Sequence, residues 1–162
     1  MGLKIKENDR WPFFTAYRDA AYIMRHDASR TTVLREPKEK REFRLLNESG
    51  KEFVVYRVDG GIITQDVPKC DYAIYVDDDT LFLIELKGAD LNRAIEQIDS
   101  AIDLLVKVPR VKVTKLNARI VVSKVSVPAV VASKERRLQQ RLHGIYGGGD
   151  YKKQSRQMEE RI

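Results

Sequence analysis

Residues Lys69 to Gly88 read KCDYAIYVDDDTLFLIELKG and contain the clearest strand signals of the chain. Two apolar segments flank three consecutive aspartates, and this pattern predicts two strands, 71–76 and 80–87, joined by a turn. The second strand ends in the charged sequence Glu85-Leu86-Lys87. Charged side chains are rare inside sheets unless they are paired or used in chemistry, so this strand end is the first candidate for a functional site.

The register of this hairpin decides whether Asp71 lies beside Glu85. If the three aspartates form a three-residue loop, counting back along both strands places Asp71 opposite Glu85. Directly opposed residues point to the same face of a sheet, so the two carboxylates would then be neighbours. A two- or four-residue loop would instead place Asp71 opposite Ile84 or Leu86, with its side chain on the other face.

Two neighbouring carboxylates destabilise a sheet unless a cation removes their repulsion. Mg²⁺ is commonly held by one or two carboxylates together with waters and phosphate oxygens. We therefore expect Asp71 and Glu85 to bind Mg²⁺ or Mn²⁺, with the carbonyl oxygen of Leu86 as a further ligand. Lys87 shares a face with Glu85 and could position or activate an attacking water. The alternative is a strand end where these charges meet solvent and pair with their neighbours.

The rest of the chain predicts an α/β fold with a mixed central sheet flanked by helices on both sides. One domain over 1–162 is expected, with its core at about 42–123 and a basic helical part at about 133–162. Before the two strands above, the patterns predict a helix over 12–27, a polar connector over 29–41 and a hairpin over 42–61 that turns at 47–50. After them, the patterns predict a helix capped by Asp90 and ended by Pro109, a strand over 118–125 and a helix over 133–146. A flexible GGGDY loop and a charged tail are expected to follow.

The net charge of +6 favours an anionic partner, most simply nucleic acid, although ribosomal and membrane-surface proteins share this property. The segment from Leu104 to Ser133 contains no acidic residue. Basic residues in and after it are expected to hold a phosphate backbone, the alternative being a solvated basic face. They are Lys107, Arg110, Lys112, Lys115, Arg119, Lys124, Lys134, Arg136, Arg137 and Arg141.

Several other classes of site do not fit the sequence. Cys70 is the only cysteine, so no internal disulfide or cysteine-based zinc site can form. The three aspartates lack the ligand spacing of a calcium-binding EF-hand, which leaves a solvated turn. No apolar run approaches the ~18 residues of a membrane span, and the first residues lack the apolar core of a signal peptide. We therefore expect a cytoplasmic protein with no membrane partner.

Asp71, thirteen intervening residues and then Glu85-Leu86-Lys87 resemble the motif of the PD-(D/E)XK nuclease superfamily, which has the restriction-endonuclease-like fold. The core of that family is a helix, three or four strands with the motif on a central hairpin, a helix and a strand, and the resemblance covers about 42–123. It implies Mg²⁺-dependent phosphodiester hydrolysis, with Asp71 and Glu85 as the metal-binding acids and Lys87 as the lysine of the motif.

The resemblance has departures. Cys70 replaces the proline that precedes the first acid. The exonuclease branch often carries Gln-x-x-x-Tyr on the following helix, and here Gln97 is present whereas Ala101 replaces the tyrosine. Gln97 is therefore expected either at the active site or as an ordinary polar residue on the helix edge. Asp19 is the only acid well inside the predicted first helix, where some members place a further ligand.

The function expected from these residues is a metal-dependent nuclease that hydrolyses DNA, in which Asp71, Glu85, Lys87 and Gln97 form the catalytic site. One alternative is a non-catalytic DNA-binding or assembly module that keeps the same fold. Another is a basic interaction protein in which Glu85-Leu86-Lys87 occurs by chance. A homodimer is compatible with the cutting of two strands, but no residue pattern specifies one.

Overall fold

The computed structural model describes residues 11–37, 40–88, 90–123 and 129–162. Its centre is a six-stranded sheet in which β4 to β6 are antiparallel and β6 to β8 are parallel, so the predicted mixed sheet of an α/β fold is confirmed. In spatial order the strands are β1 (Ile23–Asp27), β4 (Phe53–Arg57), β5 (Tyr72–Val76), β6 (Thr80–Gly88), β7 (Lys115–Val122) and β8 (Tyr151–Ser155).

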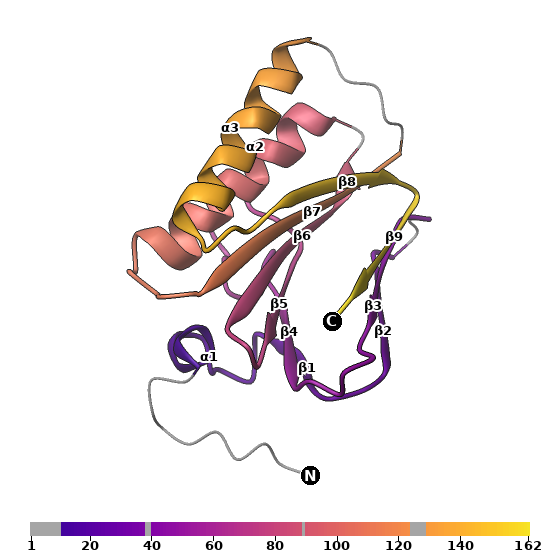
Figure 1. The fold of residues 1–162 in the computed structure, drawn as a ribbon, viewed down its shortest axis with the longest axis vertical. Coiled ribbons are helices and arrows are strands. Elements are labelled where there is room, and N and C mark those ends of the chain that lie inside the picture. Colours follow the sequence, from indigo (N-terminus) through magenta and orange to yellow (C-terminus); the bar gives the residue numbers. More distant parts are fainter. Residues whose placement is uncertain (1–10, 38–39, 89, 124–128) are drawn as a thin grey trace.

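Helices cover one face of this sheet (Figure 1). They are α1 (Pro12–Ala16), α2 (Leu91–Ile102), which continues as a π-helical turn over Asp103–Lys107, and α3 (Ala129–Ile145). Asp90 caps α2 by accepting a hydrogen bond from the backbone N–H of Arg93, and the predicted apolar stripe of this helix is buried. The two crossings β6–α2–β7 and β7–α3–β8 bring the carboxyl ends of three parallel strands to one edge.

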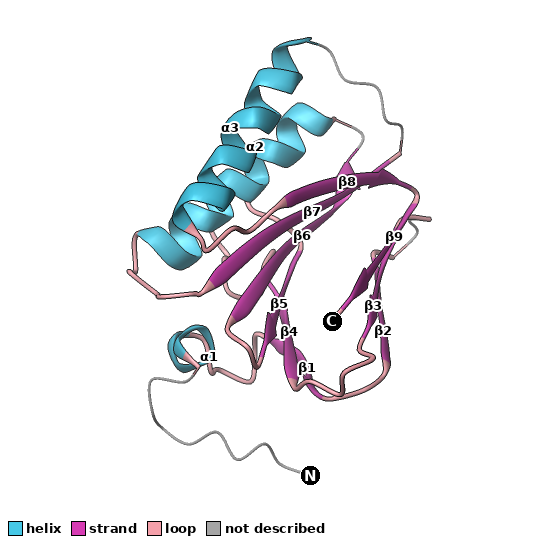
Figure 2. Cartoon of the chain, viewed as in Figure 1, coloured by secondary structure: helices cyan, strands magenta, loops and turns pink. Residues whose placement is uncertain are grey.

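Strands, not helices, cover the other face, so the prediction of helices on both sides is wrong (Figure 2). The second sheet contains β2 (Thr31–Arg35), β3 (Glu42–Leu46) and β9 (Gln157–Arg161) in the order β2-β3-β9. Its apolar side chains form a second core against the main sheet. Leu34, Phe43, Leu45 and Met158 are the buried residues that it contributes.

The first 30 described residues differ from the prediction. The helix expected over 12–27 ends at Ala16, and its second half is the edge strand β1. The polar connector expected over 29–41 contains β2, whose residues alternate between exposed and buried. Phe13 and Tyr17 sit at helical spacing because α1 packs on the sheet, where the ring of Phe13 lies 5.4 Å from that of Tyr56. That spacing stops at the end of this short helix.

The hairpin expected over 42–61 is also wrong, although both of its strands exist. β3 pairs with β2 and β9, whereas β4 pairs with β1 and β5. The turn between them therefore carries the chain from one sheet to the other. Asn47 stabilises this crossing, because its side-chain amide bonds both the N–H and the carbonyl oxygen of Lys51 at 2.9 and 2.7 Å.

At the C-terminal end, the predicted helix is present as α3, but the charged tail is not a tail. Residues 151–161 form β8, which extends the main sheet, and β9, which completes the second sheet. The expected basic helical part over 133–162 is therefore helical only as far as Ile145.

The central hairpin matches the prediction closely. Asp77–Asp79 form the three-residue turn, and Val76 pairs with Thr80 as the three-residue loop requires. β7 also matches the predicted strand, beginning three residues earlier, at Lys115. The register that the candidate site needs is thus the register that the structure has.

Candidate functional site

Asp71 is held between two strands at the edge where β6 ends. Its N–H donates to the carbonyl oxygen of Ile84 at 3.1 Å, and its own carbonyl oxygen accepts the N–H of Val58 at 3.0 Å. Its side chain is equally fixed, because Oδ2 accepts the N–H of Leu86 at 2.8 Å. Asp71 is only 3% exposed, so the sequence folds a carboxylate into the interior beside β6.

Glu85 lies on β6 next to this position and is fully buried. Tyr72 pairs with Ile84, so the next position on each strand is Asp71 and Glu85. Both carboxylates act on the neighbouring thiol of Cys70. Burial raises the pKa of this thiol most, and the charges of Glu85 and Asp71 raise it further. The structure therefore brings the two predicted acids together, and it leaves Cys70 a protonated, unreactive thiol.

The other two residues of the motif are placed on the same strand. Leu86 is buried in the second core, and its N–H fixes the carboxylate of Asp71. Its carbonyl oxygen as a metal ligand stays a prediction. Lys87 continues β6, but its side chain lies outside the part of the chain that the structure describes, so its catalytic role also stays a prediction.

Gln97 lines a cleft of about 360 Å³ on the helix-covered side, next to the loop that leads into Asp71. Arg93, one turn earlier on α2, lines the same cleft and is exposed. Across from them is Lys69, whose ammonium contacts the carbonyl oxygens of Gln65 and Val67. Arg93 was missed by the sequence reasoning, although its i, i+4 relation to Gln97 places both on one helix face.

Two further features of the superfamily pattern have no counterpart among the described residues. Ala101 is fully buried between α2 and the sheet, so the place of the missing tyrosine is filled by core packing. Asp19 does not lie on a helix, because α1 ends before it, and its exposed carboxylate accepts the N–H of Ala21 at 2.9 Å.

The donors present fit a cation that keeps part of its water shell. Among the described residues there is no group of three or more His, Cys, Asp or Glu side chains that could enclose a metal. Asp71 and Glu85 supply carboxylate oxygens only, and no histidine or second cysteine accompanies them. Such a set suits Mg²⁺ or Mn²⁺ completed by water and phosphate oxygens, and it does not suit structural zinc.

The basic stretch does not gather at one place, and its role in holding a phosphate backbone stays a prediction. Three of its cations neutralise carboxylates of the protein itself: Arg119 binds Glu160 and Asp150, Lys134 binds Glu96, and Arg141 binds Asp99 and Asp103. Arg119 is only 1% exposed. It faces the second core, so it cannot meet a substrate.

Four more of these cations lie at the opposite end of the sheet. Lys115 pairs with Thr80 at the start of β6, and Glu85 lies five positions further along the strand. That separation is about 16 Å at the usual rise of a strand. Lys107, Arg110 and Lys112 precede Lys115 and are exposed at that end. Lys124 lies outside the described residues, and Arg136 and Arg137 remain exposed on α3.

Comparison with known proteins gives no assignment: no family model, no curated protein and no solved structure matches this chain. Within the described ranges, no helix has both the length and the apolar character needed to cross a bilayer.

Proposed function

We propose that this protein is a metal-dependent nuclease of the PD-(D/E)XK type that hydrolyses phosphodiester bonds in DNA. The observation that carries the proposal is the juxtaposition of Asp71 and Glu85, two buried carboxylates on neighbouring strands at one edge of the sheet. Neighbouring carboxylates at the end of a strand supply the oxygen donors that Mg²⁺ and Mn²⁺ commonly use.

The order of elements around the motif supports the restriction-endonuclease-like core. The acids lie on the hairpin of β5 and β6, which is followed by α2 and then by β7 parallel to β6. This is the order of the superfamily core named above. The site also lies outside the carboxyl ends of parallel strands, where open α/β sheets commonly bind their ligands.

In this account Asp71 and Glu85 hold the cation, and the N–H of Leu86 fixes the orientation of the Asp71 carboxylate. A bound Mg²⁺ would supply Lewis acidity and make hydroxide accessible near neutral pH. Lys87 would orient the attacking water and offset the charge that develops on the phosphate. Arg93 and Gln97 line the adjoining cleft and offer hydrogen-bond donors to the substrate.

The test is cleavage of labelled linear, circular, single-stranded and branched DNA in Mg²⁺ or Mn²⁺. We expect the wild type to cut at least one of these substrates, and Glu85→Gln and Lys87→Ala to lower the rate at least about 100-fold. Lys107→Ala is the matched control, because it removes an exposed lysine at the opposite end of the sheet.

Absence of cleavage together with equal DNA binding by all four proteins would overturn the catalytic proposal. It would leave a DNA-binding or assembly module built on a nuclease-like fold.

A further inference from the structure

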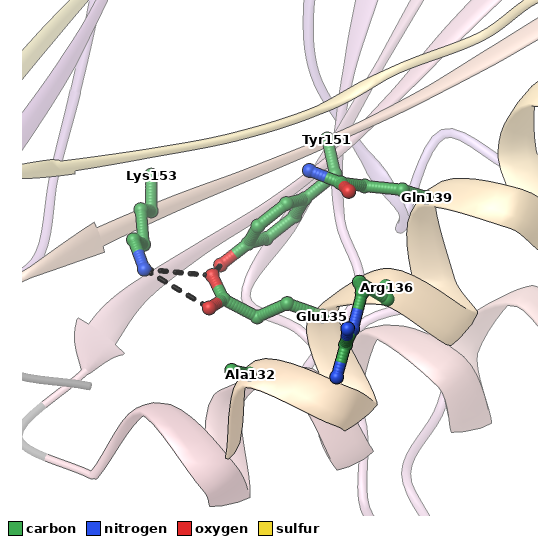
Figure 3. A pocket seen from close by; sticks show the side chains of 6 residues that line it. All are labelled: Ala132, Glu135, Arg136, Gln139, Tyr151 and Lys153. Carbon is green, nitrogen blue, oxygen red and sulfur yellow. Dashed lines mark hydrogen bonds and ion pairs between the residues drawn. The ribbon is translucent and has the colours of Figure 1, made fainter. Parts of the chain in front are cut away.

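A second groove lies between α3 and the edge strand β8, away from Asp71. It has a volume of about 500 Å³ (Figure 3). Four of its residues, at i, i+3, i+4 and i+7, form one face of α3, and two come from β8. They are Ala132, Glu135, Arg136, Gln139, Tyr151 and Lys153.

At the bottom of this groove, the side chain of Lys153 is held in place by Glu135. The ammonium of Lys153 lies 3.0 Å from Oε1 and 2.8 Å from Oε2 of Glu135, and the hydroxyl of Tyr151 donates to Oε2 at 2.7 Å (Figure 3). Glu135 is 9% exposed, so its carboxylate is turned inward. Burial and the Glu135 charge raise the pKa of Tyr151, which keeps its hydroxyl a donor.

Glu135 is the one carboxylate among the groove residues, and Lys153 neutralises it. An ammonium has three N–H donors, so the two oxygens of Glu135 leave at least one donor of Lys153 for a ligand. Arg136 is exposed at the rim and forms no ion pair with another described residue, and Gln139 adds an amide. The groove therefore offers one uncompensated cation, Arg136, together with an N–H of Lys153 and an amide donor, a set suited to phosphate oxygens.

The position of this groove relative to the candidate site follows from strand register. Glu85 pairs with Ile120, and Ile120 pairs with Lys153, so the three residues form one row across β6, β7 and β8. Paired residues share a face, and Ile120 belongs to the core under the helices. At the usual strand spacing, Lys153 lies about 10 Å across the sheet from Glu85. Ile120 between them is fully buried, so a strand that contacts both places must pass around the edge of the sheet and not along this row.

We infer that the groove between α3 and β8 binds the phosphate backbone of the nucleic-acid strand whose cleavage is proposed at Asp71 and Glu85. The inference rests on the proposed function and adds a second contact surface for the same strand. Arg136 and Gln139 contact phosphates from the rim, and Lys153 contacts them from the floor. Glu135 and Tyr151 act as positioning residues that hold Lys153 in place.

The experiment measures binding of a fluorescently labelled DNA by anisotropy in EDTA, across a series of salt concentrations, so that no cleavage is needed. Arg136→Gln is compared with Arg137→Gln, which removes the same charge from the next residue of α3, outside the groove. Gln139→Lys is compared with Gln140→Lys, which adds a charge outside the groove.

We expect Arg136→Gln to weaken binding roughly five- to tenfold at 0.1 M salt and to reduce the salt slope by about 0.7–0.9. Gln139→Lys should strengthen binding and steepen that slope, and the two control variants should change it by less than half as much. Equal effects of groove and control variants would overturn the inference even if the wild type cuts DNA. Selective effects in a protein that never cuts DNA would sustain the groove and overturn the nuclease proposal.

Discussion

Arg119 shows how a charged residue can belong to the core of this fold. Its guanidinium lies between the two sheets, where Nε and one terminal nitrogen bond the two carboxylate oxygens of Glu160 at 2.8 and 3.1 Å. It also lies 2.8 Å from Asp150 and donates to the carbonyl oxygens of Ala118 and Asp150. A bidentate pair of this kind joins β7 to β9 and so fixes the second sheet to the first.

Removing the partner of a buried charge costs more than the pair itself contributes, because the remaining charge loses its compensation. We therefore expect Glu160→Ala to lower the free energy of unfolding by about 3 kcal/mol, measured by urea denaturation. The control is Glu159→Ala, the preceding residue on the exposed side of β9, with a change within about 0.5 kcal/mol. Similar destabilisation by both variants would contradict the structural role of the pair.

At the scale of elements, the glycines between α3 and β8 are required by close backbone packing. A Cβ atom on Gly149 would lie 1.9 Å from the carbonyl oxygen of Leu116, the second residue of β7. Gly147 adopts φ +61° and would bring a Cβ 2.0 Å from the carbonyl oxygen of Thr114. The loop that the sequence indicated as flexible therefore docks against the start of β7.

Gly149→Ala should lower the free energy of unfolding by about 2–3 kcal/mol, because the backbone of β7 must move to accept the methyl group. Gly144→Ala, near the end of α3, is the matched control, since nothing lies within 4 Å of its Cβ position. Alanine is the better helix former, so that variant should be unchanged or up to about 1 kcal/mol more stable. Thermal and urea unfolding of both variants would measure these changes. An unchanged free energy of unfolding for Gly149→Ala would show that this loop does not pack closely against β7.

The elements that could be predicted from the sequence are those whose pattern and partners are both local. The β5–β6 hairpin has its turn and both strands within 17 residues, and α2 has its cap and stripe within one helix. In β8 and β9 the inward positions include Lys153 and Glu160, whose neutralising partners Glu135 and Arg119 lie elsewhere in the chain. The sequence does not reveal these distant partners, and the hydropathy of this segment by itself indicates a solvated tail. Both strands were therefore not predicted.

At the scale of the whole molecule, the candidate acids were predictable because β5 and β6 are adjacent in sequence and pair directly. The positions of the basic side chains were not predictable, because residues close in sequence have different surroundings in the structure. Lys115 and Arg119 are four residues apart, yet Lys115 is exposed at the far end of the sheet while Arg119 is buried between the two sheets. Contacts to a substrate depend on such placement, which a count of basic residues cannot provide.

If Asp71 and Glu85 together bind a divalent cation, calorimetric titration with Mn²⁺ detects that binding without any need for cleavage. We predict that the wild type binds Mn²⁺ and that Asp71→Asn loses this binding, because the amide keeps an acceptor for the N–H of Leu86 but removes the charge. Asp66→Asn, an exposed acid in the adjoining cleft, should bind as the wild type does. Equal Mn²⁺ binding by Asp71→Asn and the wild type would show that these two carboxylates do not form a metal site.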